Sequence, residues 1–355
     1  MMKKHVQNAI KVLAVLWFVY MIIHIAFVGK FFLLNFPAST PTFFFVIVPV
    51  ILLVYFLVQK KRRVIFIGIM SVSLVMGTTQ LDINIATKSN NNINKDNYIP
   101  VKVFCWNTNL WDQLKDGNAF YDYLKNQKAD VYLLQEYLHC VTDRNDKSQT
   151  PFKICNIIPG FPPNYLTIDE TERIKKEFPG YFFSTDGQFV IISRYPIIRS
   201  HADYSEQYAV SDVDINGKTM RFFNVHMLLH IEPGNPFVPY FYNAISRRYK
   251  AREIGFRNLN EDIKKTNTDY FIEGDFNSSK SMGVMNGLLK DHIDTVKYSR
   301  DILPLTFEMD GLKLWRFDYA LIPENDNILI SSHKYLPHKG LSDHNPLSIN
   351  MYLKR

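Results

Sequence analysis

The stretch IEGDFNS, residues 272–278, runs from an apolar β-forming segment straight into Glu273, Asp275 and Asn277. Short runs rich in β-branched and aromatic residues are typical of strands, and runs of this kind that lead into polar residues recur along the chain. They predict seven strands, at residues 101–106, 131–134, 189–192, 221–225, 270–272, 317–322 and 327–331. Two amphipathic patterns predict helices at 120–127 and 242–265. The fold class is therefore α/β, without the regular alternation of a plain doubly wound sheet.

Asn, Asp, Glu and His residues stand at the ends of most of these strands. A single residue of this kind is more often a turn former or a helix cap than a catalyst, but six sets of one composition indicate a shared site. The sets are Asn107 and Asn109; Gln135 and Glu136; Asn224 and His226; Glu273, Asp275 and Asn277; Arg316 and Asp318; and Ser342, Asp343 and His344. Mg²⁺ prefers carboxylate and amide oxygens, and hydrolysis of a phosphate ester needs a base, hydrogen-bond donors and a cation near the phosphate. The pattern predicts metal-assisted phosphoryl transfer.

Seven stretches carry a resemblance to a known family. They are VFCWNTN (103–109), VYLLQE (131–136), FVIISRYPI (189–197), FFNVHM (222–227), IEGDFNS (272–278), RFDYALI (316–322) and LSDHNPL (341–347). In this order, over about residues 100–353, the sequence resembles the endonuclease/exonuclease/phosphatase superfamily. The resemblance implies a four-layer α/β sandwich of two facing mixed sheets, with the active site where the strand ends meet. It also implies an enzyme that hydrolyses phosphate ester bonds with Mg²⁺, or with Mn²⁺ in its place.

The resemblance further implies a metal site and a base. Glu136 is expected as the main metal ligand, with Asn107 as a second metal-site residue and Asp343 near the metal. The role of base is assigned jointly to Asp275 and His344, because members of the family differ in this assignment.

The other implied roles concern the phosphate and the water that attacks it. Asn277, together with Asp275, is expected to orient this water and to hold the phosphate, and Asp318 is expected as the carboxylate partner of His344. His226 matches a histidine that binds phosphate or protonates the leaving group. Three further residues are assigned to phosphate or substrate binding: Asn224, Arg194 and Asn109. Arg194 is expected to shape the rim of the site, and Asn109 is equally well explained as a turn residue.

The net charge of +7 divides unevenly along the chain. Residues 1–81 contain eight Lys or Arg and no Asp or Glu, which gives +8, whereas the rest contains 33 Lys or Arg against 34 Asp or Glu, which gives −1. Within the basic part, three apolar runs at 12–28, 42–58 and 64–81 carry no formal charge. Each reaches the lower limit of the roughly 17–25 residues that cross a bilayer. We expect three transmembrane helices rather than a cleavable signal peptide, because no small-residue cleavage site follows the first run.

Basic residues near the ends of these runs predict the orientation. Lys3 and Lys4 precede the first run, and residues 60–63 (KKRR) separate the second from the third. Basic residues at span ends stay in the cytoplasm, so the amino terminus is expected in the cytoplasm and everything after residue 82 outside it. The protein is thus expected to be a multi-pass protein of the cell membrane, with an Asn-rich linker at 82–99 and a catalytic domain at 100–355.

Charge and apolar loops bear on the substrate. Nucleases depend on basic surfaces to hold a polyanion, and the catalytic part carries −1. The apolar stretches 158–166 and 228–242 suggest lipid contact, although packing on their own domain explains them equally well. The first hypothesis is a membrane-anchored phosphodiesterase or phosphatase acting on a phospholipid head group. The alternative is an extracytoplasmic nuclease, and the third is a non-catalytic binding module. No obligatory protein partner is evident, and the pairing of Cys140 with Cys155 stays open.

Overall fold

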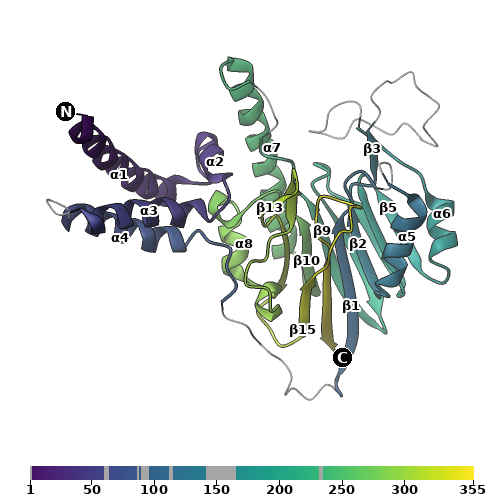
Figure 1. Cartoon of the computed structure of the whole chain (residues 1–355). Helices are drawn as coiled ribbons and strands as arrows, with labels where there is room; N and C mark the ends of the chain where they lie inside the picture. Colours follow the sequence, from purple (N-terminus) through teal and green to yellow (C-terminus); the bar gives the residue numbers. More distant parts are fainter. Residues whose placement is uncertain are drawn as a thin grey trace. The chain divides into compact units, whose positions relative to one another are not determined.

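A computed structural model of the chain describes residues 2–59, 64–85, 88, 96–111, 115–140, 165–231 and 235–355. These residues form two compact units. The first consists of Met1–Ile83 and Ser278–Asn286, and the second of Asn84–Asn277 and Gly287–Arg355. Each unit has its own core of buried side chains. Figure 1 shows the helices and strands along the chain.

The first unit is helical. Its elements are α1 (Met2–Phe27), α2 (Phe32–Ala38), α3 (Phe44–Val58), α4 (Val64–Thr78) and the short helix η2 (Lys280–Met282). Only α1, among the described helices, is long and apolar enough to cross a membrane, over Lys4–Phe27. The helices α3 and α4 have 15 residues each, which is about 22 Å of helix against a hydrocarbon core of about 30 Å.

We expected three transmembrane helices, but among the described helices only α1 is long enough to span a membrane. The second and third apolar runs do form helices, but both helices are shorter than predicted. The helix α3 begins at Phe44 instead of residue 42, and α4 ends at Thr78 instead of residue 81. The basic run at 60–63, on which the predicted orientation depends, lies outside the described residues.

Small residues allow the helices of the first unit to approach closely. A Cβ atom on Gly77 of α4 would lie 2.0 Å from the carbonyl oxygen of Phe45 in α3, so only glycine fits there. The segment Ser278–Asn286 belongs to the same unit, although it follows the GDFN stretch in the chain. The Ser281 hydroxyl donates a hydrogen bond to the carbonyl oxygen of Ala38 (2.8 Å).

The second unit contains two six-stranded mixed sheets. The first has the order β15-β16-β1-β2-β6-β5, and the second has the order β11-β14-β10-β9-β8-β7. The strands of the first sheet are β1 (Tyr98–Asn107), β2 (Val131–Gln135), β5 (Phe182–Asp186), β6 (Phe189–Ser193), β15 (Ile328–Tyr335) and β16 (Leu347–Lys354). Those of the second are β7 (Ile197–Ala202), β8 (Tyr208–Ile215), β9 (Lys218–His226), β10 (Asp269–Asp275), β11 (His292–Asp294) and β14 (Asp318–Pro323). Two small hairpins complete the strands: β3 (Leu138–Cys140) with β4 (Tyr165–Thr167), and β12 (Phe307–Met309) with β13 (Leu312–Trp315).

Alternating side chains of the strands form two cores. In β1, Val103 and Cys105 pack between the sheets, together with Phe222 and Phe271 of the second sheet. Phe104, in between, faces the other side and packs in the aromatic core under the helices. These helices are α5 (Gly117–Asn126) and α6 (Thr171–Glu177), whereas α7 (Pro239–Lys264) packs beside the second sheet (Figure 1). The short helices α8 (Asn286–Asp291) and η3 (Thr295–Tyr298) lead into and out of β11.

The seven predicted strands and the two predicted helices are confirmed, with ends that differ by a few residues. The α/β class with two mixed sheets is confirmed as well. Half of the predicted linker (86, 87 and 89–95), residues 158–164 of the first apolar stretch, and Cys155 lie outside the described residues.

Candidate active site

The strand pairing brings the predicted polar residues to one edge of the two sheets. In the first sheet, β1 and β2 are parallel, and Asn107 is the register partner of Gln135. In the second, β9 and β10 are parallel and end together, with His226 opposite Asp275. The antiparallel strand β14 begins at Asp318, which is also opposite Asp275. Because parallel strands end at the same edge of a sheet, five distant parts of the sequence meet there.

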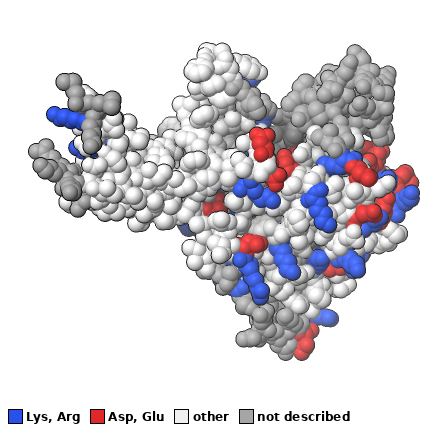
Figure 2. All heavy atoms as spheres, viewed as in Figure 1, with Lys and Arg blue, Asp and Glu red and all other residues white. Residues whose placement is uncertain are grey.

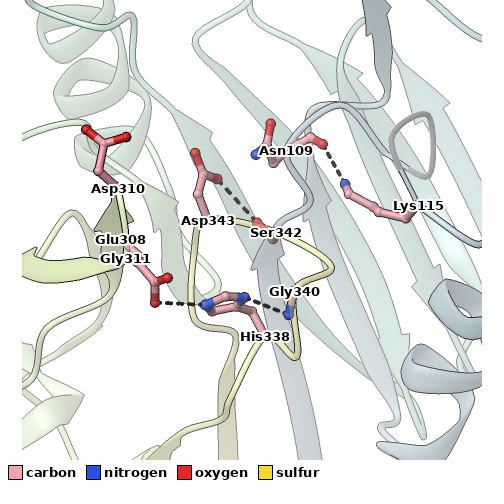
Figure 3. Close-up of a pocket in the computed structure, with 9 residues that line it drawn as sticks. All are labelled: Asn109, Lys115, Glu308, Asp310, Gly311, His338, Gly340, Ser342 and Asp343. Atoms are coloured by element: carbon pink, nitrogen blue, oxygen red, sulfur yellow. Dashed lines mark hydrogen bonds and ion pairs between the residues drawn. The ribbon is translucent and has the colours of Figure 1, made fainter.

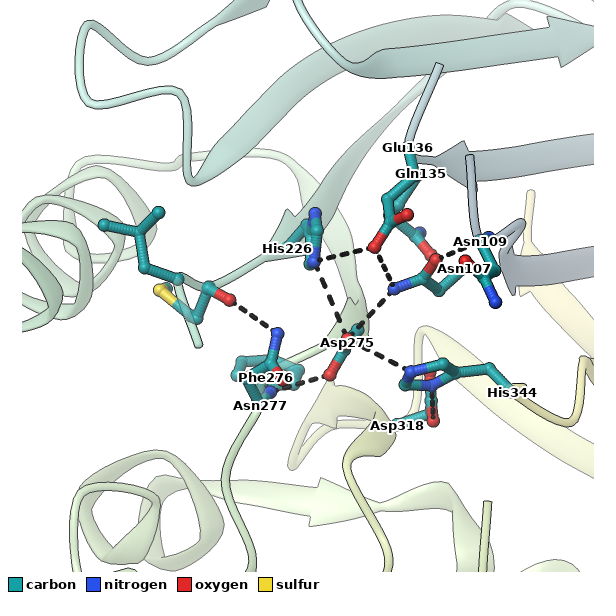
Figure 4. A network of polar contacts seen from close by, with 12 residues as sticks. Asn107, Asn109, Gln135, Glu136, His226, Asp275, Phe276, Asn277, Asp318 and His344 are labelled. Carbon is teal, nitrogen blue, oxygen red and sulfur yellow. Dashed lines mark hydrogen bonds and ion pairs between the residues drawn. The ribbon is translucent and has the colours of Figure 1, made fainter. Parts of the chain in front are cut away.

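Glu136 and Asn107 form one half of the site (Figure 4). The Asn107 side-chain amide donates to Glu136 Oε1 (3.1 Å) and to Asp275 Oδ2 (3.0 Å), so it joins the two sheets. The second carboxylate oxygen of Glu136 accepts a hydrogen bond from the Leu110 amide (2.9 Å). Glu136 has a φ of 63°, a left-handed conformation that is uncommon outside glycine. Such backbone strain is concentrated at functional sites.

His344 and two carboxylates form the other half. His344 Nδ1 lies 2.8 Å from Asp318 Oδ2, and its Nε2 lies 3.6 Å from Asp275 Oδ2. Two hydrogen bonds hold the backbone of His344 in place. The Trp106 indole donates to its carbonyl oxygen (2.9 Å), and its backbone N–H donates to the Ser342 hydroxyl (3.0 Å). The Asp318 contact orients the ring so that Nε2 faces the centre of the site (Figure 4).

His226 lies opposite His344. Its Nε2 is 3.6 Å from Glu136 Oε1 and 3.7 Å from Asp275 Oδ2, and its Nδ1 is 2.5 Å from the side-chain oxygen of Gln188. Burial lowers the pKa of His226, and the Asp275 carboxylate offsets part of this effect. The residue therefore favours the neutral form at neutral pH.

Asn277 is held by its neighbours at the end of β10. Its backbone N–H donates to Asp275 Oδ1 (2.7 Å), and its side-chain Nδ2 donates to the carbonyl oxygen of Met227 (2.8 Å). The preceding Gly274 has a φ of 134°, and a Cβ atom there would lie 1.9 Å from the carbonyl oxygen of Val225. The glycine of the GDFN stretch is therefore required by the close approach of β9 to β10.

The electrostatics of the site fit a divalent cation. Burial raises the pKa of Glu136, and the nearby Asp343 carboxylate raises it further. Burial also raises the pKa of Asp275 to about 6. Burial alone would lower the pKa of His344, but Asp318 and Asp275 raise it well above its usual value. Carboxylates thus outnumber the cationic groups in a buried site, and a bound cation removes this excess of negative charge.

Two sets of side chains are suited to hold a metal. Glu136 and Asn107, with Asp343 nearby, form the set that the sequence predicts. Asp275, Asp318 and His344 form a second set, whose ligand atoms lie within 4.8 Å of one another. In this second set His344 Nδ1 and Asp318 are paired with each other, which favours a role in proton transfer for them.

A pocket of about 340 Å³ opens beside the site (Figure 3). Asn109 and Asp343 line it on the side of the predicted metal residues. Its remaining lining residues are Lys115, Glu308, Asp310, Gly311, His338, Gly340 and Ser342. His338 Nε2 lies 3.2 Å from Glu308 Oε2. The pocket is thus polar and carries both signs of charge, and it is placed to receive part of a substrate.

Two predicted substrate residues lie elsewhere. Arg194 follows β6 and pairs with Asp130 (3.1 Å), which precedes β2. Since Glu136 follows the other end of β2, Arg194 is at the opposite edge of the sheet, and its placement at the rim of the site is corrected. The Asn224 side chain is buried between the sheets and bonds to Gln135 (2.6 Å), which makes it a connection between the sheets rather than part of the open site.

Sequence reasoning did not single out several residues that support the site. Gln188 holds His226, and Thr306 accepts hydrogen bonds from the amides of Phe317 and Asp318. Arg252 of α7 is buried and donates to the carbonyl oxygen of Asn277 (3.4 Å). Only the pairing of strands and the path of α7 reveal these contacts, because none of the three residues belongs to a motif.

Comparison with known proteins finds a matching family model and similar solved structures. The model of the Endonuclease/Exonuclease/phosphatase family matches residues 92–344. No curated protein matches the sequence significantly. Among solved structures, a family protein from Leptotrichia buccalis C-1013-b is 14% identical, with a TM-score of 0.48 over 71% of this chain and 99% of that chain. A family protein from Bacteroides thetaiotaomicron is 15% identical, with a TM-score of 0.48 over 72% and 96%. Humanized D. rerio TDP2 is 16% identical, with a TM-score of 0.45 over 71% and 98%.

The match to the family model covers more than half of the chain. The residues that form the site at the strand ends lie within the matched residues, as do both mixed sheets except for β16. The chain therefore belongs to the endonuclease/exonuclease/phosphatase family, a group of divalent-metal-dependent hydrolases that act on phosphate ester bonds.

Proposed function

We propose that this protein is a membrane-anchored, Mg²⁺-dependent phosphoesterase that hydrolyses a phospholipid head group outside the cytoplasm. The observation that carries the hydrolytic part is the convergence of Glu136, Asn107, Asp275, Asp318 and His344 at one sheet edge, although they come from five parts of the sequence. Mn²⁺ is the alternative metal, and both diesters and monoesters of phosphate are candidate substrates.

The protonation states divide the chemical roles. With a pKa of about 6, Asp275 is largely ionised at neutral pH and accepts the proton of the attacking water. The raised pKa of His344 keeps its imidazolium charged, so it donates from Nε2 to a phosphate oxygen and stabilises the negative charge that develops there. Asp318 orients this ring. Asn277 is the candidate donor that holds the phosphate.

A divalent metal would be held by Glu136 and Asn107, with Asp343 nearby. When bound, it supplies positive charge that neutralises the phosphate oxygens. His226, neutral and held by Gln188, faces the same space and is the candidate contact of the phosphate or of the leaving group.

The membrane part of the proposal rests on α1 and on charge. The span Lys4–Phe27 is apolar and mostly exposed, and Lys3 and Lys4 at its start favour a cytoplasmic amino terminus. A multi-pass arrangement that includes α3 and α4 would place the second unit (Asn84–Asn277 and Gly287–Arg355), which we call the enzyme unit, outside the cytoplasm. Cleavage of the enzyme unit by a protease added to intact cells tests this orientation, and protection until the membrane is opened contradicts it.

The charge on the face seen in Figure 2 favours a lipid over a nucleic acid. On the visible face of the enzyme unit, acidic and basic residues are intermixed (Figure 2), whereas nucleic-acid binding depends on clustered positive charge. The experiment is a substrate panel for the full chain in detergent, with Mg²⁺ and with EDTA: phospholipid vesicles, bis-p-nitrophenyl phosphate and plasmid DNA. Metal-dependent hydrolysis of the lipid supports the proposal. Hydrolysis of the plasmid alone supports the nuclease, and no hydrolysis of any substrate supports the binding module.

A further inference from the structure

The amino-terminal end of α7 exposes a group of large apolar side chains. We name Phe237, Val238, Tyr240 and Tyr242 the α7 tip. Phe237 is 92% exposed and Tyr240 is 72% exposed, and the other two are exposed by 40% or more. The helix end that carries them projects beyond the sheets of the enzyme unit (Figure 1). Large apolar side chains exposed together at one end of an element mark a candidate site of contact with a protein or a membrane.

The exposure does not come from a helix that lacks packing. Phe241 and Ile245, on the neighbouring face of the same helix, are buried at 8% and 5% exposure. This helix end is therefore packed along the line of Phe241 and Ile245, while Tyr240 and Tyr242, one residue to either side of Phe241, stay exposed.

The stretch that carries the α7 tip is basic, although Glu232 precedes it and Glu253 follows it in the sequence. Residues 235–252 contain no Asp or Glu, and the exposed Arg247 and Lys250 follow the tip within the next turns of the helix. The Arg247 guanidinium lies 5.9 Å from the centre of the Tyr240 ring. The projecting helix end is white and blue on the visible face (Figure 2). Aromatic side chains with basic residues next to them suit the head-group region of a bilayer that contains anionic lipid.

The α7 tip is also linked to the active site through its own helix. Arg252 donates to the carbonyl oxygens of Leu228 and Asn277, and His230 Nδ1 lies 3.2 Å from the same oxygen of Asn277. Leu228 follows His226 by two residues. The position of α7 and the position of two active-site loops therefore depend on each other.

We propose that the α7 tip inserts into the interfacial region of a bilayer containing anionic phospholipid, and that it holds the active site next to the phosphates of lipid head groups. This inference rests on the proposed function, because it deepens the choice of a membrane lipid as substrate. Other occupants of the tip, such as a protein partner, are outcomes of the test.

The first experiment measures insertion directly. The full chain with Phe237→Trp is reconstituted into vesicles of phosphatidylcholine and phosphatidylglycerol with brominated acyl chains, which quench tryptophans located in the bilayer. The matched control is Tyr204→Trp, at a residue that is 74% exposed. It adjoins Asp203, which contacts Asn258 (3.3 Å), about 27 Å along α7 from Tyr240. We expect strong quenching of the tryptophan added by Phe237→Trp and none of that added by Tyr204→Trp.

Trp17 of α1 separates the two possible failures. Quenching of Trp17 in the parent chain shows that the anchor is inserted, so an unquenched Phe237→Trp in the same vesicles overturns the inference alone. Without quenching of Trp17, the anchoring in the proposed function fails. Protection of the added tryptophan by a bound protein, without quenching by lipid, also overturns the inference.

The second experiment measures the consequence for activity. The double variant Phe237→Ser/Tyr240→Ser is expected to lose most of its activity on vesicle lipid and to keep its activity on soluble bis-p-nitrophenyl phosphate, because neither residue contacts the site. Tyr204→Ser is the control for both substrates. An equal loss on both substrates, or full activity on vesicles, overturns the inference.

Discussion

His344 is the residue on which the proposed chemistry depends most. It is buried, its Nδ1 is paired with Asp318, and its Nε2 faces Asp275. We expect His344→Ala to reduce kcat by about 10²–10⁴-fold, because a positioned acid–base group contributes about this much. The control is His201→Ala, at an exposed histidine of β7. Equal activity of the two variants under saturating substrate contradicts the role of His344.

The pH dependence of activity follows from two pKa shifts. Asp275 acts as a carboxylate, so kcat/KM is expected to rise with pH up to and through about 6. His344 acts as an imidazolium, so activity is expected to fall when the pH exceeds its raised pKa. Asp318→Asn removes the larger source of that increase and is expected to move the alkaline limb to lower pH. A profile of kcat/KM against pH for both proteins checks this, and an unchanged alkaline limb contradicts it.

At the same scale, the sequence predicts which residues gather but not where every one of them points. Asp275, Asp318 and His344 follow or precede strands that end at one edge, so their motifs were sufficient to predict that these three residues lie together. Arg194 also follows a strand, but β6 is antiparallel to β2, and this direction carries it to the opposite edge. A motif read alone contains no information on strand direction. The same limit hid Gln188, whose contact with His226 depends on the pairing of separate parts of the chain.

At the scale of the elements, a buried ion pair fixes the start of β14. Arg316 donates to both carboxylate oxygens of Asp294 (2.7 and 2.8 Å), and both side chains are largely buried. Asp294→Asn leaves the guanidinium without its charged partner, and we expect a loss of about 3–5 kcal/mol in the free energy of unfolding. Urea unfolding of the full chain in detergent measures it. The control is Asp291→Asn, at an exposed aspartate three residues earlier, and an equally small loss in both variants contradicts the account.

The same pair predicts how stability varies with pH. Burial alone would raise the pKa of Asp294, but Arg316 lowers it below its usual value. A depressed folded pKa means that the stabilisation is fully present above the unfolded pKa of about 3.9 and is lost as the pH falls through the folded pKa. We expect Asp294→Asn to flatten the acid limb of a plot of melting temperature against pH. An unchanged acid limb would argue against this coupling.

The elements also show where apolar patterns mislead. The runs at 42–58 and 64–81 are long enough in sequence for membrane spans, but their helices have 15 residues. The predicted runs are longer than the helices, because residues at the ends of the runs, such as Thr79 and Gln80, form turns. The strands were easier to predict, since their alternating or buried patterns ended at polar residues.

At the scale of the whole molecule, the chain leaves the enzyme unit after Asn277 and packs a short segment in the helical unit. Deletion of residues 1–83 removes Ala38, which accepts the hydrogen bond of Ser281, and it removes the contact of α2 with η2. We expect the truncated enzyme to melt several °C below the full chain, at about 2–4 °C per kcal/mol lost. Equal melting temperatures contradict this coupling. Ser281→Ala in the full chain tests the hydrogen bond alone and is expected to cost about 1 kcal/mol.

The net charge is distributed unevenly between the amino-terminal part and the rest of the chain. The first 81 residues carry +8, which suits a basic membrane anchor, and the remaining residues carry −1. The charge therefore supports the proposed membrane anchor, and it does not identify what the enzyme binds. The substrate depends on side chains around a polar pocket, and such a pocket leaves no pattern in the sequence.

The most direct test of the central claim is metal-dependent hydrolysis by the site at the strand ends. The measurement is the rate of hydrolysis of bis-p-nitrophenyl phosphate by the full chain with Mg²⁺, after EDTA, and after Mg²⁺ is restored, for the parent and for Glu136→Gln and Asp275→Asn. We predict hydrolysis that EDTA abolishes and Mg²⁺ restores, together with a loss of about 10²-fold or more in each variant. Hydrolysis that survives EDTA, or that both variants retain in full, would contradict the account.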